Sequence, residues 1–111
     1  MIHILRSRAT PEQAKEMCEE WEFTIKLAVD IRRQVLVGGG RLHSDCEALL
    51  LADGSQQEDI WGASWEPDLQ IVFYESIINQ RPRQQNFSMM IQDPLIRDEV
   101  EKLVRLFLGG I

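Results

Sequence analysis

The segment GGGRLHSDCE, residues 38–47, brings one of the two histidines of the chain together with two carboxylates. If this segment is extended, His43, Asp45 and Glu47 project from one face, because side chains alternate along a strand. An imidazole and carboxylates on one face can hold a divalent metal, as in the facial triad of iron sites. The sequence thus allows a metal site at His43, Asp45 and Glu47.

Ion pairing is the alternative role for these three side chains, and we favour it. Facial-triad sites use a second histidine, and the other histidine here, His3, is far away in the sequence. Clusters of ionisable groups also arise from ordinary ion-pair networks. We therefore expect His43, Asp45 and Glu47 to form the polar face of a half-exposed strand that pairs with arginines.

The glycines of this segment, Gly38–Gly40, either bind a phosphate through backbone N–H groups or allow a turn. A phosphate-binding loop continues with Gly-Lys-Ser/Thr and opens a helix. Here RLHSD follows the glycines and is expected to lead into a strand. Glycines that permit positive φ at a hairpin, bulge or turn explain the run better.

The loop RPRQQN, residues 81–86, is the second candidate site. The guanidinium groups of Arg81 and Arg83, with the amide of Asn86, can bind a carboxylate or phosphate. Alternatively, the arginines bridge to a second subunit or pair with internal carboxylates, namely Asp45, Glu47 or Asp53. We favour pairing, because acidic residues outnumber basic ones and such pairs are common.

Two helices with clear starts are expected to frame these sites. In ATPEQAKEMCEEWEF, Thr10 is an N-cap, Pro11 suits the first helical position, and Gln13 completes a capping box. In DPLIRDEVEKLVRLFL, Asp93 is the N-cap, apolar residues recur at helical spacing, and Gly109 ends the helix.

Five segments between these helices have strand patterns, and IHIL forms a short strand before the first helix. The five are TIKLAVDI, its hairpin partner QVLVG, CEALLLADGS, DIWGASW and LQIVFYES. The expected fold is α+β, an antiparallel β-meander with the N-terminal and C-terminal helices packed on it. The expected element order is β-α-β-β-β-β-α. It contains four strands between the two helices, one fewer than the five segments with strand patterns.

Two aromatic residues and the cysteines are expected in the core. Trp61 and Trp65 lie four apart on one expected strand and share a face. Cys46 alternates with its acidic neighbours and faces the buried side, where a thiol is inert. Cys18 and Cys46 lack CxxC spacing, which favours reduced thiols in a cytoplasmic protein over a disulfide.

Length and charge narrow the range of functions. The 111 residues, 44% hydrophobic and 27% charged, fit one domain over residues 1–111. A net charge of −6 disfavours nucleic-acid binding and anionic membrane surfaces. There is no secretory signal and no run of about 18 apolar residues, so we expect a cytoplasmic protein. The modest core of a chain this size favours a homodimer.

Three motifs resemble those of a known family. GGGRLHSDCE, DGSQQ and RPRQQN, within a match from the first helix to the last, resemble a family of small uncharacterised prokaryotic proteins. The resemblance implies a single-domain protein of about this length. It implies no activity and assigns no catalytic or binding residue.

Two functions remain for the structure to compare. The first is a homodimeric binding module, without a cofactor, for a small anionic ligand or a protein partner. The alternative is a metal-assisted hydrolase or lyase, in which His43, Asp45 and Glu47 hold a divalent ion and Arg81 or Arg83 orients an anionic substrate. No Gly-x-Ser-x-Gly elbow or other catalytic signature is present, so the sequence leaves open whether this is an enzyme.

Overall fold

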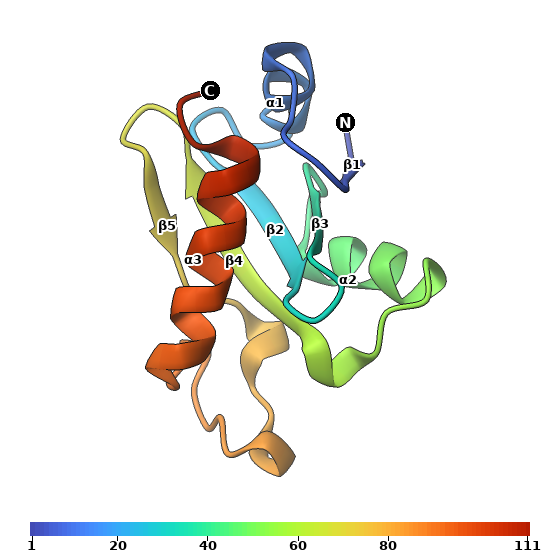
Figure 1. Cartoon of the computed structure of the whole chain (residues 1–111), viewed down its shortest axis with the longest axis vertical. Helices are drawn as coiled ribbons and strands as arrows, with labels where there is room; N and C mark the ends of the chain where they lie inside the picture. The colour runs from blue at the N-terminus through green and yellow to red at the C-terminus, as the bar shows by residue number, and fades with distance from the viewer.

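A five-stranded antiparallel sheet forms the centre of the computed structural model, which describes all 111 residues (Figure 1). Its strands are β1 (His3–Leu5), β2 (Ile25–Asp30), β3 (Val35–Gly38), β4 (Ile60–Glu66) and β5 (Ile71–Phe73). Their order across the sheet is β1-β3-β2-β4-β5. The middle strand, β2, pairs with β4 over its whole length, from Ile25 opposite Trp65 to Asp30 opposite Ile60.

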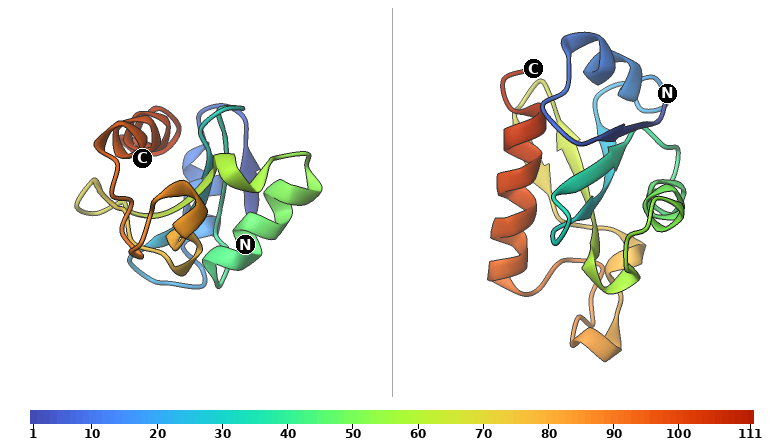
Figure 2. Two further views of the ribbon diagram at one scale, coloured as in Figure 1. Left: turned by 90° about the horizontal axis from the view of Figure 1, so that it is seen from below. Right: turned by 45° about the vertical axis from the view of Figure 1, so that its right-hand side comes forward.

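Three α-helices cover the sheet: α1 (Pro11–Met17), α2 (His43–Ala52) and α3 (Pro94–Leu108). Helices α2 and α3 lie on opposite faces of the sheet, while α1 lies at one end, near both termini (Figure 2). Short 3-10 turns occupy Gln57–Asp59, Ile77–Asn79 and Pro82–Gln84. None of the helices combines the length and the hydrophobicity that a membrane span requires.

The expected α+β class, the antiparallel sheet and both helix starts are confirmed. Thr10 Oγ1 accepts from the Gln13 N–H at 3.1 Å, and Gln13 Oε1 accepts from the Thr10 N–H at 3.0 Å, which completes the capping box. Asp93 Oδ1 accepts from the Leu95 N–H at 2.9 Å at the start of α3. Four of the five predicted strand segments are strands, so the strands and terminal helices follow the order β-α-β-β-β-β-α.

The prediction of a strand over residues 46–55 is wrong, because this segment forms most of α2 and the turn that ends it. Its sequence, CEALLLA, consists mainly of strong helix formers. A short continuous apolar run has no periodicity that separates a buried strand from a buried helix. Helix α2 lies between β3 and β4 in the chain, and β4 pairs with β2 and not with β3. The order of the strands across the sheet therefore differs from their order in the sequence, as it would not in a simple meander.

The dipeptide Asp53-Gly54, a sequence common in β-hairpin turns, lies here at the end of α2. Gly54 has a φ of +103°, a conformation that L side chains rarely adopt. The N–H of Ser55 reaches back to the Leu50 carbonyl at 3.0 Å and satisfies one of the free carbonyls at the helix end. The same dipeptide therefore serves as a C-terminal helix cap.

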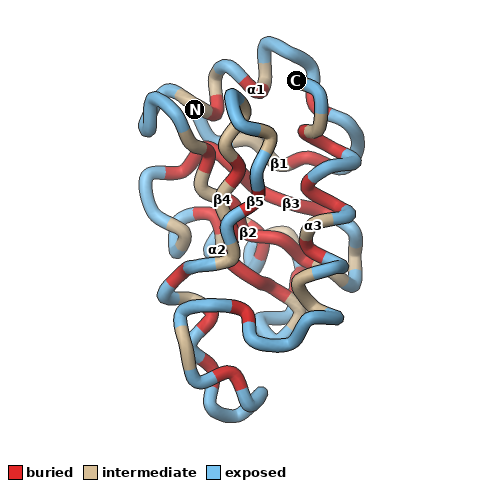
Figure 3. Tube along the Cα trace, turned by 90° about the vertical axis from the view of Figure 1, so that its left-hand side faces the viewer, coloured by how far each residue is buried: buried red, intermediate tan, exposed pale blue.

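Two apolar clusters hold these layers together, and the central strands carry many of the buried residues (Figure 3). The larger cluster, of 18 residues, fills the α3 side of the sheet and includes Trp61 and Trp65, as predicted. The smaller cluster, of six residues, lies between the sheet and α2: Ala28, Val35, Val37, Cys46, Leu50 and Ile60. Both cysteines are free thiols, and Cys46 is fully buried.

Truncating the α2 side of the core tests this packing. Leu50 is fully buried, so Leu50→Ala should lower the free energy of unfolding by about 2–5 kcal/mol, measured by urea denaturation. Its neighbour Leu51 is 41% exposed, and Leu51→Ala should cost less than about 1 kcal/mol. Equal losses for the two variants would contradict the observed face of α2.

Candidate functional site

His43, Asp45 and Glu47 lie on the first turns of α2, so they do not share one face as the strand prediction required. Successive helical residues are rotated by about 100°, which places Glu47 on the side of His43 and Asp45 on the other side. No group of three or more His, Cys, Asp and Glu side chains is arranged to hold a metal ion. The geometry on which the predicted metal site depended is therefore not formed.

Each of these three side chains has its own partner. Asp45 Oδ2 accepts from the Leu42 N–H at 3.2 Å and closes the start of α2. Nε2 of His43 lies 2.9 Å from the Ala63 carbonyl oxygen, which can only accept, so Nε2 carries the proton. Burial lowers the pKa of His43 below its ordinary value of 6.5, although the bond to Ala63 opposes this shift.

Arg81 is a buried partner of Glu47, as the favoured ion-pair interpretation predicts. Its Nη2 lies 3.4 Å from Glu47 Oε2. Its Nε and Nη1 donate to the carbonyls of Ile78 at 2.9 Å and Gln57 at 2.8 Å. The guanidinium also stacks over Trp61, 4.8 Å from the ring centroid. Arg81 thus ties its loop to α2 and to the sheet.

Arg83 and Asn86 do not join Arg81 in a binding site. Arg83 is exposed and makes no hydrogen bond or ion pair. Asn86 is buried, and its Nδ2 lies 2.7 Å from the Asn79 carbonyl and 2.9 Å from that of Met90. Asn79 in turn binds both backbone groups of Gly62. These amides fix the loop before α3 to the sheet, a role that sequence reasoning missed.

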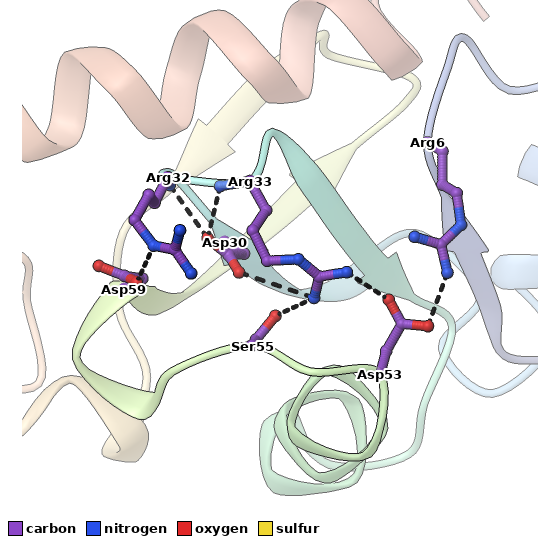
Figure 4. A network of polar contacts seen from close by, with 7 residues as sticks. All are labelled: Arg6, Asp30, Arg32, Arg33, Asp53, Ser55 and Asp59. Carbon is purple, nitrogen blue, oxygen red and sulfur yellow. Dashed lines mark hydrogen bonds and ion pairs between the residues drawn. The ribbon is translucent and has the colours of Figure 1, made fainter.

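Asp53 belongs to a second polar network, which fastens the turn between β2 and β3 to the end of α2 (Figure 4). Asp53 pairs with Arg6 at 2.6 Å and with Arg33 at 2.8 Å, so of the three candidate carboxylates it is not the one that pairs with Arg81 or Arg83. The buried Asp30 accepts the backbone N–H groups of Arg32 and Arg33 at 3.0 and 2.9 Å. The sequence showed these charges but not their proximity.

The glycine run, Gly38–Gly40, leads into a helix and not into the expected strand. Gly39 has a φ of +94°, which confirms the prediction of a positive φ at a turn. A Cβ on Gly39 would clash with the Met1 carbonyl oxygen and would lie 2.9 Å from Met17 Cα. The run therefore lets the chain pass under β1 and α1 before α2 begins.

A pocket opens at the start of α2, with a cavity volume of about 320 Å³. Its lining comes from β2, from α2 with its cap, and from the loops on both sides of Ile77–Asn79: Lys26, Leu42, His43, Ser44, Glu75, Ser76, Ile77 and Met89. Of the predicted site residues, only His43 lies here. Asp45, Glu47, Arg81, Arg83 and Asn86 are not part of the lining.

The pocket holds charges that the protein itself does not neutralise. Lys26 makes no ion pair, and its Nζ lies over the ring of Trp21, 4.8 Å from the centroid. Glu75 also makes no ion pair. The N-cap of α2 is Leu42, whose side chain cannot accept a hydrogen bond, so the N–H groups of His43 and Ser44 have no capping partner.

These features define a small α+β protein with a polar pocket at a helix N-terminus and no side-chain cluster arranged to hold a metal ion. The chain belongs to the family described as "Protein of unknown function (DUF5674)", whose model matches residues 3–107. The expected membership of an uncharacterised family is thereby confirmed. No curated protein and no solved structure matches the chain.

Removing the buried guanidinium tests the structural role of Arg81. Arg81→Met leaves the Glu47 carboxylate and two carbonyls without their donor, so the free energy of unfolding should fall by about 3 kcal/mol. Arg83→Met removes the same charge from an exposed position and should change the free energy of unfolding by less than about 0.5 kcal/mol. Urea denaturation measures the free energy of unfolding of both variants. Equal values for Arg81→Met and Arg83→Met would disprove the structural role of Arg81.

The lowered pKa of His43 predicts a pH-dependent stability. Below the ordinary value of 6.5, the unfolded chain takes up a proton that the folded protein resists, so acidification favours unfolding. From about pH 7.5 to about pH 5.5, the wild type should lose stability relative to His43→Gln, by at most about 1.4 kcal/mol per pH unit. Parallel stability profiles of the two proteins would refute this.

Proposed function

We propose that this protein is a cytoplasmic, homodimeric binding module whose pocket at the start of α2 binds a small anionic ligand through a carboxylate. The observation that carries this proposal is the cavity of about 320 Å³ that Lys26 and the start of α2 line together. Lys26 makes no ion pair, and the N–H groups of His43 and Ser44 have no capping partner. Pockets for small molecules usually enclose about 300–1,000 Å³, so this cavity suits a small ligand.

The start of α2 and Lys26 favour a negatively charged group on the ligand at this end of the pocket. The N-terminus of a helix carries a partial positive charge, and its first N–H groups point outwards as donors. Asp45 uses the N–H of Leu42 and leaves those of His43 and Ser44 to a ligand. The ammonium of Lys26 adds a full charge, because no carboxylate of the protein neutralises it.

The walls of the pocket favour an organic anion. Leu42 and Ile77 are 51% and 67% exposed, and Met89 also lies partly in solvent, although all three are apolar. An apolar group of the ligand would cover them and gain free energy in proportion to the area removed from water. A carboxylate with a short hydrocarbon tail satisfies both parts of the lining.

The metal-assisted alternative gains no comparable support. It needs His43, Asp45 and Glu47 together, but Asp45 caps the helix on the other side and Glu47 binds Arg81. Of the two arginines assigned to the substrate, Arg81 is engaged by carbonyl groups and Glu47, and Arg83 does not line the pocket. A specific observation therefore favours the binding function and none favours the hydrolase or lyase.

A ligand titration tests the binding function. Titrating 4-methylpentanoate, a carboxylate with an apolar tail, in a calorimeter should give saturable binding to the wild type. Lys26→Met should weaken this binding by about tenfold or more, the size of one charge-assisted hydrogen bond. Lys102→Met removes a lysine from the exposed side of α3 and should leave the affinity for 4-methylpentanoate unchanged. Equal affinities of the wild type and Lys26→Met would sink the proposal.

Two further features support the remaining parts of the proposal. The free thiols of Cys18 and Cys46 are consistent with a reducing compartment. On the edge strand β5, Ile71 and Phe73 are 40% and 47% exposed on the same face, and no charged residue of the strand protects this edge.

Sedimentation velocity tests the dimer. The wild type should sediment as a dimer at micromolar concentration, and Phe73→Glu should shift it to the monomer by placing a charge in the contact. Leu106→Glu adds the same charge to an exposed apolar position on α3 and serves as the matched control. A monomeric wild type would rule out the homodimer.

A further inference from the structure

The pocket at the start of α2 contains one positive and one negative side chain that do not pair with each other. Lys26 comes from β2, and Glu75 comes from the segment after β5. Neither residue forms an ion pair with another group of the protein. Both side chains line the cavity, and neither neutralises the other through a direct contact.

We propose that the ligand of this pocket is a zwitterion, an α-amino acid with an apolar side chain. Its carboxylate binds the start of α2 and Lys26, and its ammonium binds Glu75. This inference rests on the proposed function, and it adds a second charge to the ligand.

The charge balance of the lining separates a zwitterion from a simple anion. Lys26 and Glu75 sum to zero charge, so a ligand with a single negative charge gains from the first residue and is repelled by the second. Phosphate, with a higher negative charge, is repelled more strongly by Glu75. A zwitterion gains from both, because each of its charges faces a charge of opposite sign.

His43 also lines this pocket, as a neutral side chain. Its Nε2 donates to the Ala63 carbonyl at 2.9 Å, so the neutral ring keeps Nδ1 as an acceptor. Burial, and to a smaller degree Lys26, lower the pKa of His43 and keep the ring neutral. A neutral imidazole accepts a hydrogen bond from an ammonium group and does not repel it.

The apolar residues at the pocket decide the class of amino acid. Leu42 and Ile77 are more than half exposed, and Met89 is 39% exposed. The lining has no third charged side chain that would bind an acidic or basic side chain of the ligand. An aliphatic side chain is therefore the complement of this wall.

Calorimetric titration with three matched compounds tests the inference. L-leucine carries both charges, 4-methylpentanoate lacks the ammonium, and 3-methylbutylamine lacks the carboxylate. Leucine should bind the wild type at least about tenfold more tightly than 4-methylpentanoate, and the amine should not bind measurably. Equal affinities for leucine and 4-methylpentanoate would overturn the zwitterion and leave the carboxylate site intact. No binding of either compound would overturn both proposals.

The variant Glu75→Gln locates the ammonium site. It should abolish the advantage of leucine without weakening the binding of 4-methylpentanoate, because the carboxylate does not use Glu75. Glu99→Gln, on the exposed side of α3, should behave as the wild type. If leucine keeps its advantage in Glu75→Gln, the assignment of the ammonium to Glu75 is wrong.

Discussion

The central strand β2 has neighbours on both edges, β3 and β4, and needs cover on both faces. Leu27 and Val29 point into the cluster under α3, and Ala28 points into the cluster under α2. Because α2 covers only part of its face, Lys26 and Asp30 lie beyond its two ends. The pocket forms at Lys26, at the start of α2, and the arginine and aspartate network forms at Asp30, near its end (Figure 4). The length of α2 thus sets where the polar sites of this face lie.

The parts of the fold that local chemistry specifies could be predicted from the sequence. Thr10 and Asp93 are caps whose oxygen atoms need only the next turn of chain, and both helices start where expected. The alternation in TIKLAVDI predicts β2 because each face of this strand has its own environment. In contrast, CEALLL has no alternation and no polar face, so its pattern does not separate a buried strand from a buried helix, and its strong helix formers favour the helix that is observed.

The site was less predictable, because its residues meet through the fold and not through spacing. Opposite charges predicted that Arg81 pairs with a carboxylate, and Glu47 was one of three candidates. The sequence did not show that Lys26, Ser44 and Glu75 line one cavity, since they are far apart along the chain. A weak signal existed at Lys26, a charged residue on the Thr24, Lys26, Ala28 and Asp30 face of a strand whose other face is apolar.

The glycine run connects the fold to the proposed site. The glycine run lacks the lysine of a phosphate-binding loop, but a helix follows the glycines and not the expected strand. Gly39 must lack a side chain, because the chain passes close to Met1 and Met17 there. This close passage carries the chain from β3 to the start of α2, where its free N–H groups lie beside Lys26 at one pocket. The glycines therefore act on binding indirectly: they position a helix N-terminus over a cation, and the ligand contacts the helix and not the glycines.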